Sequence, residues 1–318
     1  MTIHAPPRPY EGSDPDDRTT NIHIRAEVCR HAAVLAAKNA QKKIALALFD
    51  QLPHDEYDED AVTAPHPILN HDPDHPGSAA ENIDVAAHSA AVSSLAHDLR
   101  RDLGITSEEL VLAGEEVPER TKFLNHNAYL ARLDACDGTT NSQLYWNGHS
   151  SVVLLDQVRL GRDGSGRARH LGGAIACPHA IISWTNSSPF DQVLGRYPQV
   201  SGYVYFEHPQ FIGEQRIHAR RWSRSTGTIA AVAHSDERYQ QVRKIATAHA
   251  LDVKRFLSAG GTPLASALLG GNVDAIIEPH HVTLHDSALL IPHQLLGGAI
   301  TDLDGKPFDY LHLYETTD

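Results

Sequence analysis

Two aspartates stand three residues apart in the stretch RLDACDGTTN, and a Gly-Thr-Thr segment follows them directly. The carboxylates of Asp134 and Asp137 are the hard oxygen donors that Mg²⁺ prefers. The glycine and the threonines can turn backbone N–H groups toward a phosphate, particularly where a helix begins. The simpler alternative is a surface turn, because Asp-x-x-Asp-Gly has a common turn composition. Partner residues elsewhere in the chain must decide between a metal site and a turn.

Three further acidic features supply candidate partners. Glu115 and Glu116 follow an apolar segment and a glycine in LAGEE, whereas Asp84 and Asp286 each precede an apolar run of helical composition. Taken singly, the glutamates fit a solvated strand end and the aspartates fit helix N-caps. Taken together, the carboxylates fit a site for two Mg²⁺ ions about 4 Å apart, which activate a water molecule and stabilise a leaving oxygen.

Composition limits the partners and the location of the protein. The 318 residues carry 27 basic and 40 acidic side chains, for a formal charge of −13, so neither nucleic acid nor an anionic membrane is an expected partner. The first residues lack the features of a secretory signal, and no apolar run reaches the length of about 18 residues that a membrane span requires. The three cysteines (Cys29, Cys136 and Cys177) are too sparse for a disulfide scaffold. We therefore expect a cytoplasmic protein.

The N-terminal part of the chain is predicted to be helical. Residues 1–20 have the composition of a disordered segment, and helical periodicity runs over 22–52. A loop rich in Pro, His and Asp over 53–82 separates this helix from a second one over 85–103. Such a long loop would be either a lid over the active site or disordered.

The remaining pattern predicts a layered fold. Strand patterns fill 109–207, and strands and helices alternate after Trp222. Helices and an antiparallel sheet followed by a smaller α/β part indicate an α+β or α/β protein, layered as an αβαβα sandwich. We expect a metal-binding lobe over 21–221 and an α/β lobe over 222–318 that completes the active site.

The ordered set of GEE, DACDGTTN and HDSA, followed by LLGGAITDLDG, resembles the inositol monophosphatase family. That family belongs to the Mg²⁺-dependent, lithium-sensitive phosphatases, and its central motif is D-P-I/L-D-G-T-T-N. The likeness covers roughly residues 22–315, nearly the whole chain. It implies a phosphoric monoester hydrolase with two or three Mg²⁺ ions per active site, a small phosphorylated metabolite as its partner, and a homodimeric assembly.

The resemblance also implies a set of metal ligands. Glu115 and the backbone carbonyl of Cys136 match ligands of the first metal. Asp134 matches the aspartate that bridges both metals, and Asp137 and Asp286 match ligands of the second metal.

The resemblance implies catalytic and substrate-binding residues as well. Asp84 and Thr139 match the pair that orients and deprotonates the attacking water. The N–H groups of Gly138 and Thr139 match the phosphate cradle. Four residues are predicted to line the substrate pocket: Gly261, Thr262, Glu278 and His285.

Departures from the family pattern favour a specialised substrate over inositol phosphate itself. Ala135 replaces a proline that stiffens the turn, so the turn is expected to be looser. The thiol of Cys136 is expected to pack inward rather than act as a redox switch or a metal ligand. His285 replaces a tryptophan, as either a packing change or a substrate contact, and Leu295-Leu296 replaces Glu-Ala.

Two clusters stay open at this stage. A zinc site formed by His66, His71 and His75 is disfavoured, because their spacing lacks zinc-finger or helical geometry. A basic cluster would be either a solvated edge or a binding site for a second phosphate or a carboxylate. Its members are Arg216, Arg220, Arg221 and Arg224.

Three functions agree with these features. The first is hydrolysis of a small polyol, sugar or nucleoside monophosphate, with inositol phosphate and histidinol phosphate among the open substrates. The second is hydrolysis of a bisphosphate such as 3′-phosphoadenosine 5′-phosphate. The third is a non-catalytic homologue that binds a phosphorylated metabolite. The presence of all the expected carboxylates disfavours the third.

Overall fold

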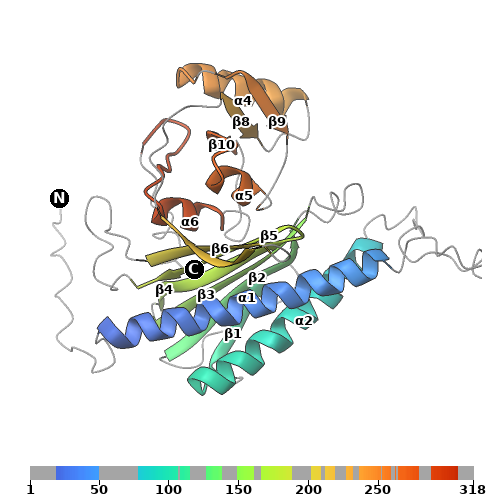
Figure 1. Ribbon diagram of the computed structural model, residues 1–318, viewed down its shortest axis with the longest axis vertical. Helices are drawn as coiled ribbons and strands as arrows, with labels where there is room; N and C mark the ends of the chain where they lie inside the picture. Colours follow the sequence, from blue (N-terminus) through green and yellow to red (C-terminus); the bar gives the residue numbers. More distant parts are fainter. Residues whose placement is uncertain are drawn as a thin grey trace, which may run out of the picture.

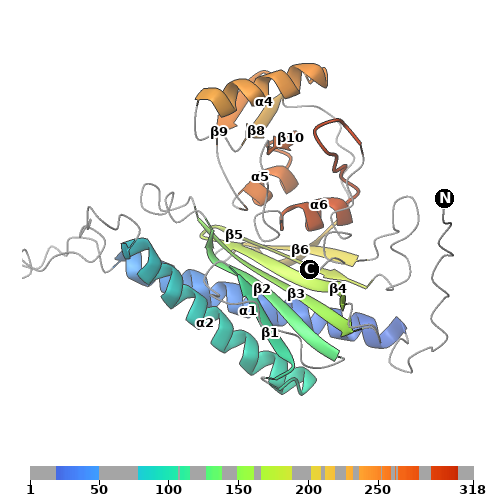
Figure 2. The same ribbon diagram turned by 180° about the vertical axis from the view of Figure 1, so that it is seen from behind.

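The protein is built of stacked layers of helices and sheets. The computed structural model describes residues 19–49, 78–106, 108–114, 127–137, 149–160, 166–187, 202–208, 212–218, 227–231, 236–251, 253–258, 262, 264–278 and 288–306. Two long helices, a seven-stranded sheet, two short helices, a three-stranded sheet and an outer helix follow one another (Figure 1). The view from behind shows the same order (Figure 2). The predicted αβαβα layering is confirmed.

The first layer consists of α1 (Thr19–Phe49) and α2 (Ser78–Leu103), and both helices begin earlier than predicted. The disordered segment expected over 1–20 is therefore wrong at its last two residues. The loop expected over 53–82 is wrong over 78–82, which belong to α2, because Ala and Glu in SAAEN favour helix. The rest of that loop, with the candidate zinc ligands His66, His71 and His75, lies outside the described residues.

The large sheet has the strand order β1-β2-β3-β4-β5-β6-β7. Its first pair is parallel and all the others are antiparallel. The strands are β1 (Leu110–Gly114), β2 (Asn127–Asp137), β3 (Ser150–Leu160), β4 (Gly166–Cys177), β5 (Ala180–Asn186), β6 (Gly202–His208) and β7 (Ile212–Ile217). The sequence pattern does not predict β7, because IGEQRI is short and polar at an edge of the sheet.

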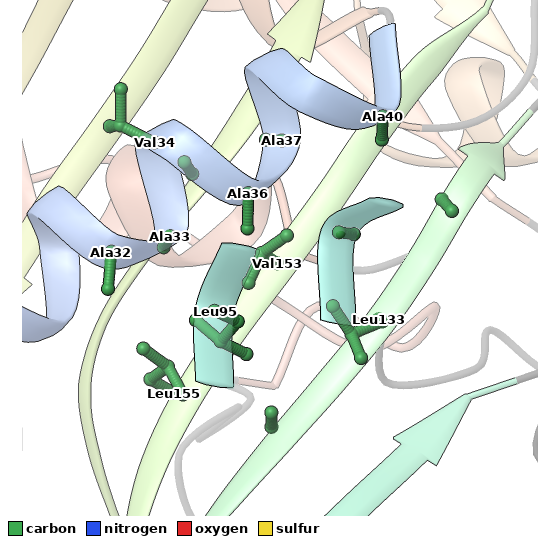
Figure 3. Packing of buried hydrophobic residues seen from close by; sticks show 14 of the residues in the cluster. Ala32, Ala33, Val34, Ala36, Ala37, Ala40, Leu95, Leu133, Val153 and Leu155 are labelled. Atoms are coloured by element: carbon green, nitrogen blue, oxygen red, sulfur yellow. The ribbon is translucent and has the colours of Figure 1, made fainter. Parts of the chain in front are cut away.

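Small side chains allow α1 to approach the sheet closely. Buried alanines line α1, while Leu95 of α2 and Leu133, Val153 and Leu155 of the sheet complete the cluster (Figure 3). A Cβ atom on Gly172 of β4 would lie 2.7 Å from the carbonyl oxygen of Trp184 and 3.4 Å from that of Ala26 on α1. Any side chain at this position would overlap the backbone of the neighbouring strand, and it would leave no free space toward α1.

The other face of the large sheet is covered by a second lobe. Its elements are β8 (Thr228–Ala231), α4 (Asp236–Ala248), β9 (Arg255–Ser258), α5 (Leu264–Leu269), β10 (Ala275–Ile277) and α6 (Leu290–Leu295). Three parallel strands form a small sheet in the order β10-β8-β9. Residues of α5 and α6 share a buried cluster with Val152 and Leu154 of β3. None of the helices in the described part of the chain is long and apolar enough to cross a membrane.

Candidate active site

Asp134 and Asp137 lie on the same face of the large sheet because β2 carries a bulge between them. In a regular strand, residues three apart point to opposite faces. Here Asp134 pairs with Val152 and Asp137 pairs with Ser150, so three steps along β2 match two steps along β3. The extra residue in β2 reverses the alternation of side chains once, so both carboxylates point to the same face of the sheet.

The packing of the two intervening residues agrees with this bulge. Ala135 and Cys136 are consecutive, yet both belong to the buried cluster on the side of α1 and α2. Ser151 Oγ donates to the Ala135 carbonyl oxygen at 2.6 Å, and the Cys136 N–H donates to Asp134 Oδ1 at 3.1 Å. The expectation that Cys136 packs inward is confirmed, and these contacts hold the bulge at Ala135, where the resemblance leads us to expect a proline.

A residue of the second lobe donates hydrogen bonds to the carboxylate of Asp137. Thr262, which precedes α5, donates to Asp137 Oδ2 from its backbone N–H at 2.7 Å and from its hydroxyl at 2.6 Å. The Ser150 hydroxyl lies 3.4 Å from the same oxygen and 2.5 Å from the Thr262 hydroxyl. The resemblance implies that Thr262 lines the substrate pocket, whereas in the structure its hydroxyl contacts Asp137, a predicted metal ligand. Ser150 was missed, although two serines at the start of an apolar strand are a signal.

Asp84 lies within α2 and not at its start. Six residues of α2 precede it, so the N-cap interpretation is wrong. The side chain is partly exposed, and the neighbouring Ile83 and Ala87 belong to the same buried cluster as Leu133 and Ala135. Asp84 thus lies on the turn of α2 that packs toward the strand carrying Asp134.

Several predicted site residues lie outside the described part of the chain: Glu115, Gly138, Thr139, Gly261, His285 and Asp286. Glu115 directly follows Gly114 in the chain, and Gly114 pairs with Leu133, which precedes Asp134. The described residues alone contain no group of three or more His, Cys, Asp or Glu side chains that could hold a metal ion. They do contain two carboxylates on one face, a donor set that fits Mg²⁺.

The remaining described predictions occupy the second lobe and the sheet edge. Glu278 directly follows β10 and is partly buried. Leu295 and Leu296 pack against the apolar cluster between the two lobes. Arg216 is exposed on β7, and its guanidinium carbon lies 3.4 Å from the centre of the Tyr203 ring. The solvated-edge interpretation therefore holds for Arg216, and the other three arginines lie outside the described residues.

Comparison with known proteins identifies the fold. No family model matches the sequence, and no curated protein sequence does. CysQ from Bacteroides thetaiotaomicron, a bacterial member of the inositol monophosphatase family, is 14% identical with a TM-score of 0.52, over 84% of this chain and 86% of that chain. This chain has the inositol monophosphatase fold. The extragenic suppressor protein SuhB from Bartonella henselae is also 14% identical, with a TM-score of 0.50 over 87% of this chain and 88% of that one.

Within its inositol monophosphatase fold, this chain buries a polar network that the sequence analysis missed. The Arg132 guanidinium and the His170 ring both bond the Asp156 carboxylate, the latter at 2.7 Å. Trp184 Nε1 donates to His170 Nε2 at 2.8 Å. These four side chains link β2 to β5 across the sheet, and Arg132 stands two residues before Asp134. The sequence did hold a signal for this network, because Arg132 and Asp156 are charged residues inside the apolar strand patterns YLARLDA and SVVLLDQV.

Burial shifts the pKa values of two side chains near the candidate site, Cys177 and His149. Desolvation raises the pKa of the Cys177 thiol to about 12, and the negative charge of Asp137 adds to the effect. Burial lowers the pKa of His149 to about 4. The thiol therefore stays protonated and the imidazole stays neutral at pH 7, so neither adds charge beside the carboxylates.

Proposed function

We propose that this protein is a Mg²⁺-dependent phosphomonoesterase of the inositol monophosphatase family. The observation that carries the proposal is the bulge in β2, which turns Asp134 and Asp137 toward one side. A turn on the surface would not need this arrangement, because Asp134 is 4% exposed and Asp137 is bonded from a distant part of the chain. A buried carboxylate and a partly buried one on the same face suit a hard divalent cation.

Five residues are proposed to hold the metal. Asp134 would bridge two ions, with Glu115 and the Cys136 carbonyl on one side and Asp137 and Asp286 on the other. When bound, Mg²⁺ lowers the pKa of a coordinated water molecule, and its positive charge stabilises the leaving oxygen. In a chain with a formal charge of −13, such positive charge would also be needed to receive an anionic substrate.

The chain's own groups would orient the reactants. Asp84 and Thr139 would position the attacking water, with Asp84 accepting its proton. The N–H groups of Gly138 and Thr139 would bond the phosphate oxygens. Gly261, Glu278 and His285 would contact the alcohol part of the substrate, which is the leaving group. Catalysis of this kind depends on positioning and electrostatics and needs no covalent phosphoenzyme.

The proposed substrate is a small polyol, sugar or nucleoside monophosphate. A 3′-phosphoadenosine 5′-phosphate-type bisphosphate and a purely binding function are the competing outcomes of the test. A homodimer and a cytoplasmic location stay predictions.

The test is phosphate release from a panel of polyol, sugar and nucleoside monophosphates and bisphosphates, with Mg²⁺ and with EDTA. We expect Mg²⁺-dependent release, abolished in Asp134→Asn and kept in Asp102→Asn, which changes an exposed carboxylate at the far end of α2. A strong preference for a bisphosphate would replace the proposed substrate class. Release from no member of the panel would overturn the proposed activity.

A further inference from the structure

Hydroxyl groups from two different parts of the chain lie beside the carboxylate of Asp137. The Thr262 hydroxyl comes from the second lobe, and the Ser150 hydroxyl comes from the first residue of β3. Thr262 and Ser150 are both 0% exposed. Burying a hydroxyl group costs free energy unless it is hydrogen-bonded. The carboxylate of Asp137 provides the acceptor for this buried pair of hydroxyls.

The distances define an ordered chain of donors. A carboxylate only accepts hydrogen bonds, and each hydroxyl has a single hydrogen to donate. The Thr262 hydroxyl lies 2.6 Å from Asp137 Oδ2, so it directs its hydrogen to the carboxylate. The Ser150 hydroxyl lies 2.5 Å from the Thr262 oxygen but 3.4 Å from Asp137, so it donates chiefly to Thr262. Ser150 therefore orients Thr262, and Thr262 orients Asp137.

The backbone gives Thr262 a fixed position. Its N–H donates to the same oxygen of Asp137 at 2.7 Å, while its carbonyl oxygen accepts the Ala265 N–H at 2.9 Å as α5 begins. Two donors from one residue converge on Asp137 Oδ2 and fix the position of that oxygen. Because Thr262 belongs to the second lobe and Asp137 to the large sheet, this contact also joins the two lobes at the site.

We propose that Thr262 and Ser150 are positioning residues that hold Asp137 in its metal-binding orientation. The inference rests on the proposed function, because it takes Asp137 as a ligand of a divalent cation. Groups that orient a metal ligand commonly change metal affinity by about 10–100-fold when they are removed. Through Thr262, the position of the second lobe sets the affinity for the ion that Asp137 binds.

The test measures metal binding without substrate. Mn²⁺ binding to the full chain is followed by electron paramagnetic resonance, and the Mg²⁺ concentration at half-maximal activity is measured in parallel. Thr262→Val keeps the shape and the N–H but removes the hydroxyl, and we expect about 10–100-fold weaker binding at one site. Ser150→Ala should weaken binding less, and Thr262→Ser should restore it to within about threefold of the wild type.

The matched control is Ser183→Ala, which removes another buried serine hydroxyl, one that contacts Arg30 on α1. It should leave Mn²⁺ affinity unchanged. If Thr262→Val does not fold, weaker Mn²⁺ binding in Ser150→Ala still tests the proposal. Wild-type Mn²⁺ affinity in folded Thr262→Val or Ser150→Ala would overturn the positioning role and leave the proposed function standing. A wild-type chain that binds no Mn²⁺ would overturn both.

Discussion

Arg132 and Asp156 form an ion pair between β2 and β3 that is almost wholly withdrawn from solvent. The side chains of Arg132 and Asp156 are 7% and 0% exposed. His170 bonds the second carboxylate oxygen of Asp156 and is itself bonded by Trp184, so each member has a partner. A buried charge is tolerated only when it is paired and hydrogen-bonded in this way.

Loss of the Asp156 charge should destabilise the fold strongly. Asp156→Asn leaves the guanidinium of Arg132 buried without its counter-ion, and we expect the free energy of unfolding to fall by about 3–5 kcal/mol. Urea unfolding followed by tryptophan fluorescence measures this change. The control is Glu207→Gln, which breaks the more exposed pair with Lys38 and should cost less than about 1 kcal/mol. Equal losses in both variants would contradict the importance of the buried pair.

Asp84 should matter for turnover and not for stability. If its carboxylate accepts a proton from the attacking water, Asp84→Asn should lower kcat by about 10²–10⁴-fold and leave KM within a few-fold. The residue is partly exposed inside α2, so the melting temperature should hardly change. Steady-state kinetics on whichever substrate the panel identifies, with Asp102→Asn as the control on the same helix, make the comparison. Wild-type kcat in Asp84→Asn would remove Asp84 from the mechanism.

His149 should make stability depend on pH below neutrality. Its pKa falls from 6.5 to about 4 on folding because burial disfavours the imidazolium. Within the described residues its Nδ1 has no hydrogen-bond partner. The unfolded chain therefore binds more protons than the folded chain between these two values. This group's contribution lowers the unfolding free energy as pH falls from 6.5 to 4, by roughly 3 kcal/mol at most, and is constant above that window.

Urea unfolding at several pH values from 4 to 7.5 measures this contribution. His149→Phe should lessen the loss of stability below pH 6.5, because no imidazole is left to be protonated on unfolding. His97→Gln, at an exposed position on α2, should leave the wild-type pH dependence in place. Parallel pH profiles for wild type and His149→Phe would show that His149 does not contribute.

The cysteines should be inert in the folded protein. All three are buried free thiols, and burial raises the pKa of both Cys29 and Cys177 to about 12. Since the thiolate is the reactive form, labelling with a disulfide reagent at pH 8 should be negligible in buffer and reach three thiols in denaturant. Rapid labelling of Cys136 in the folded protein would contradict the inward packing of its side chain.

The carboxylates of the proposed metal site could be picked out from the sequence because they lie close together in the chain. Asp134, Asp137 and the Gly-Thr-Thr segment are adjacent in the chain, and carboxylate chemistry identifies them as oxygen donors. The layering of the fold was also predictable, since helical and strand periodicities persist over long segments. Local composition misled at Asp84, because the helix-forming residues of SAAEN make α2 begin seven residues earlier than predicted.

Only the tertiary structure decided how these residues meet. The register of β2 against β3 places the bulge that brings two aspartates to one face, and no local pattern encodes that register. Ser150 and Thr262 reach Asp137 from 13 and 125 residues away, and Arg132 meets Asp156 across 24 residues. Such contacts depend on strand pairing and lobe packing, which satisfy buried polar groups between segments distant in the chain. The sequence alone therefore determined which oxygen donors are present, and the fold decided which hydroxyls and charges hold them in place.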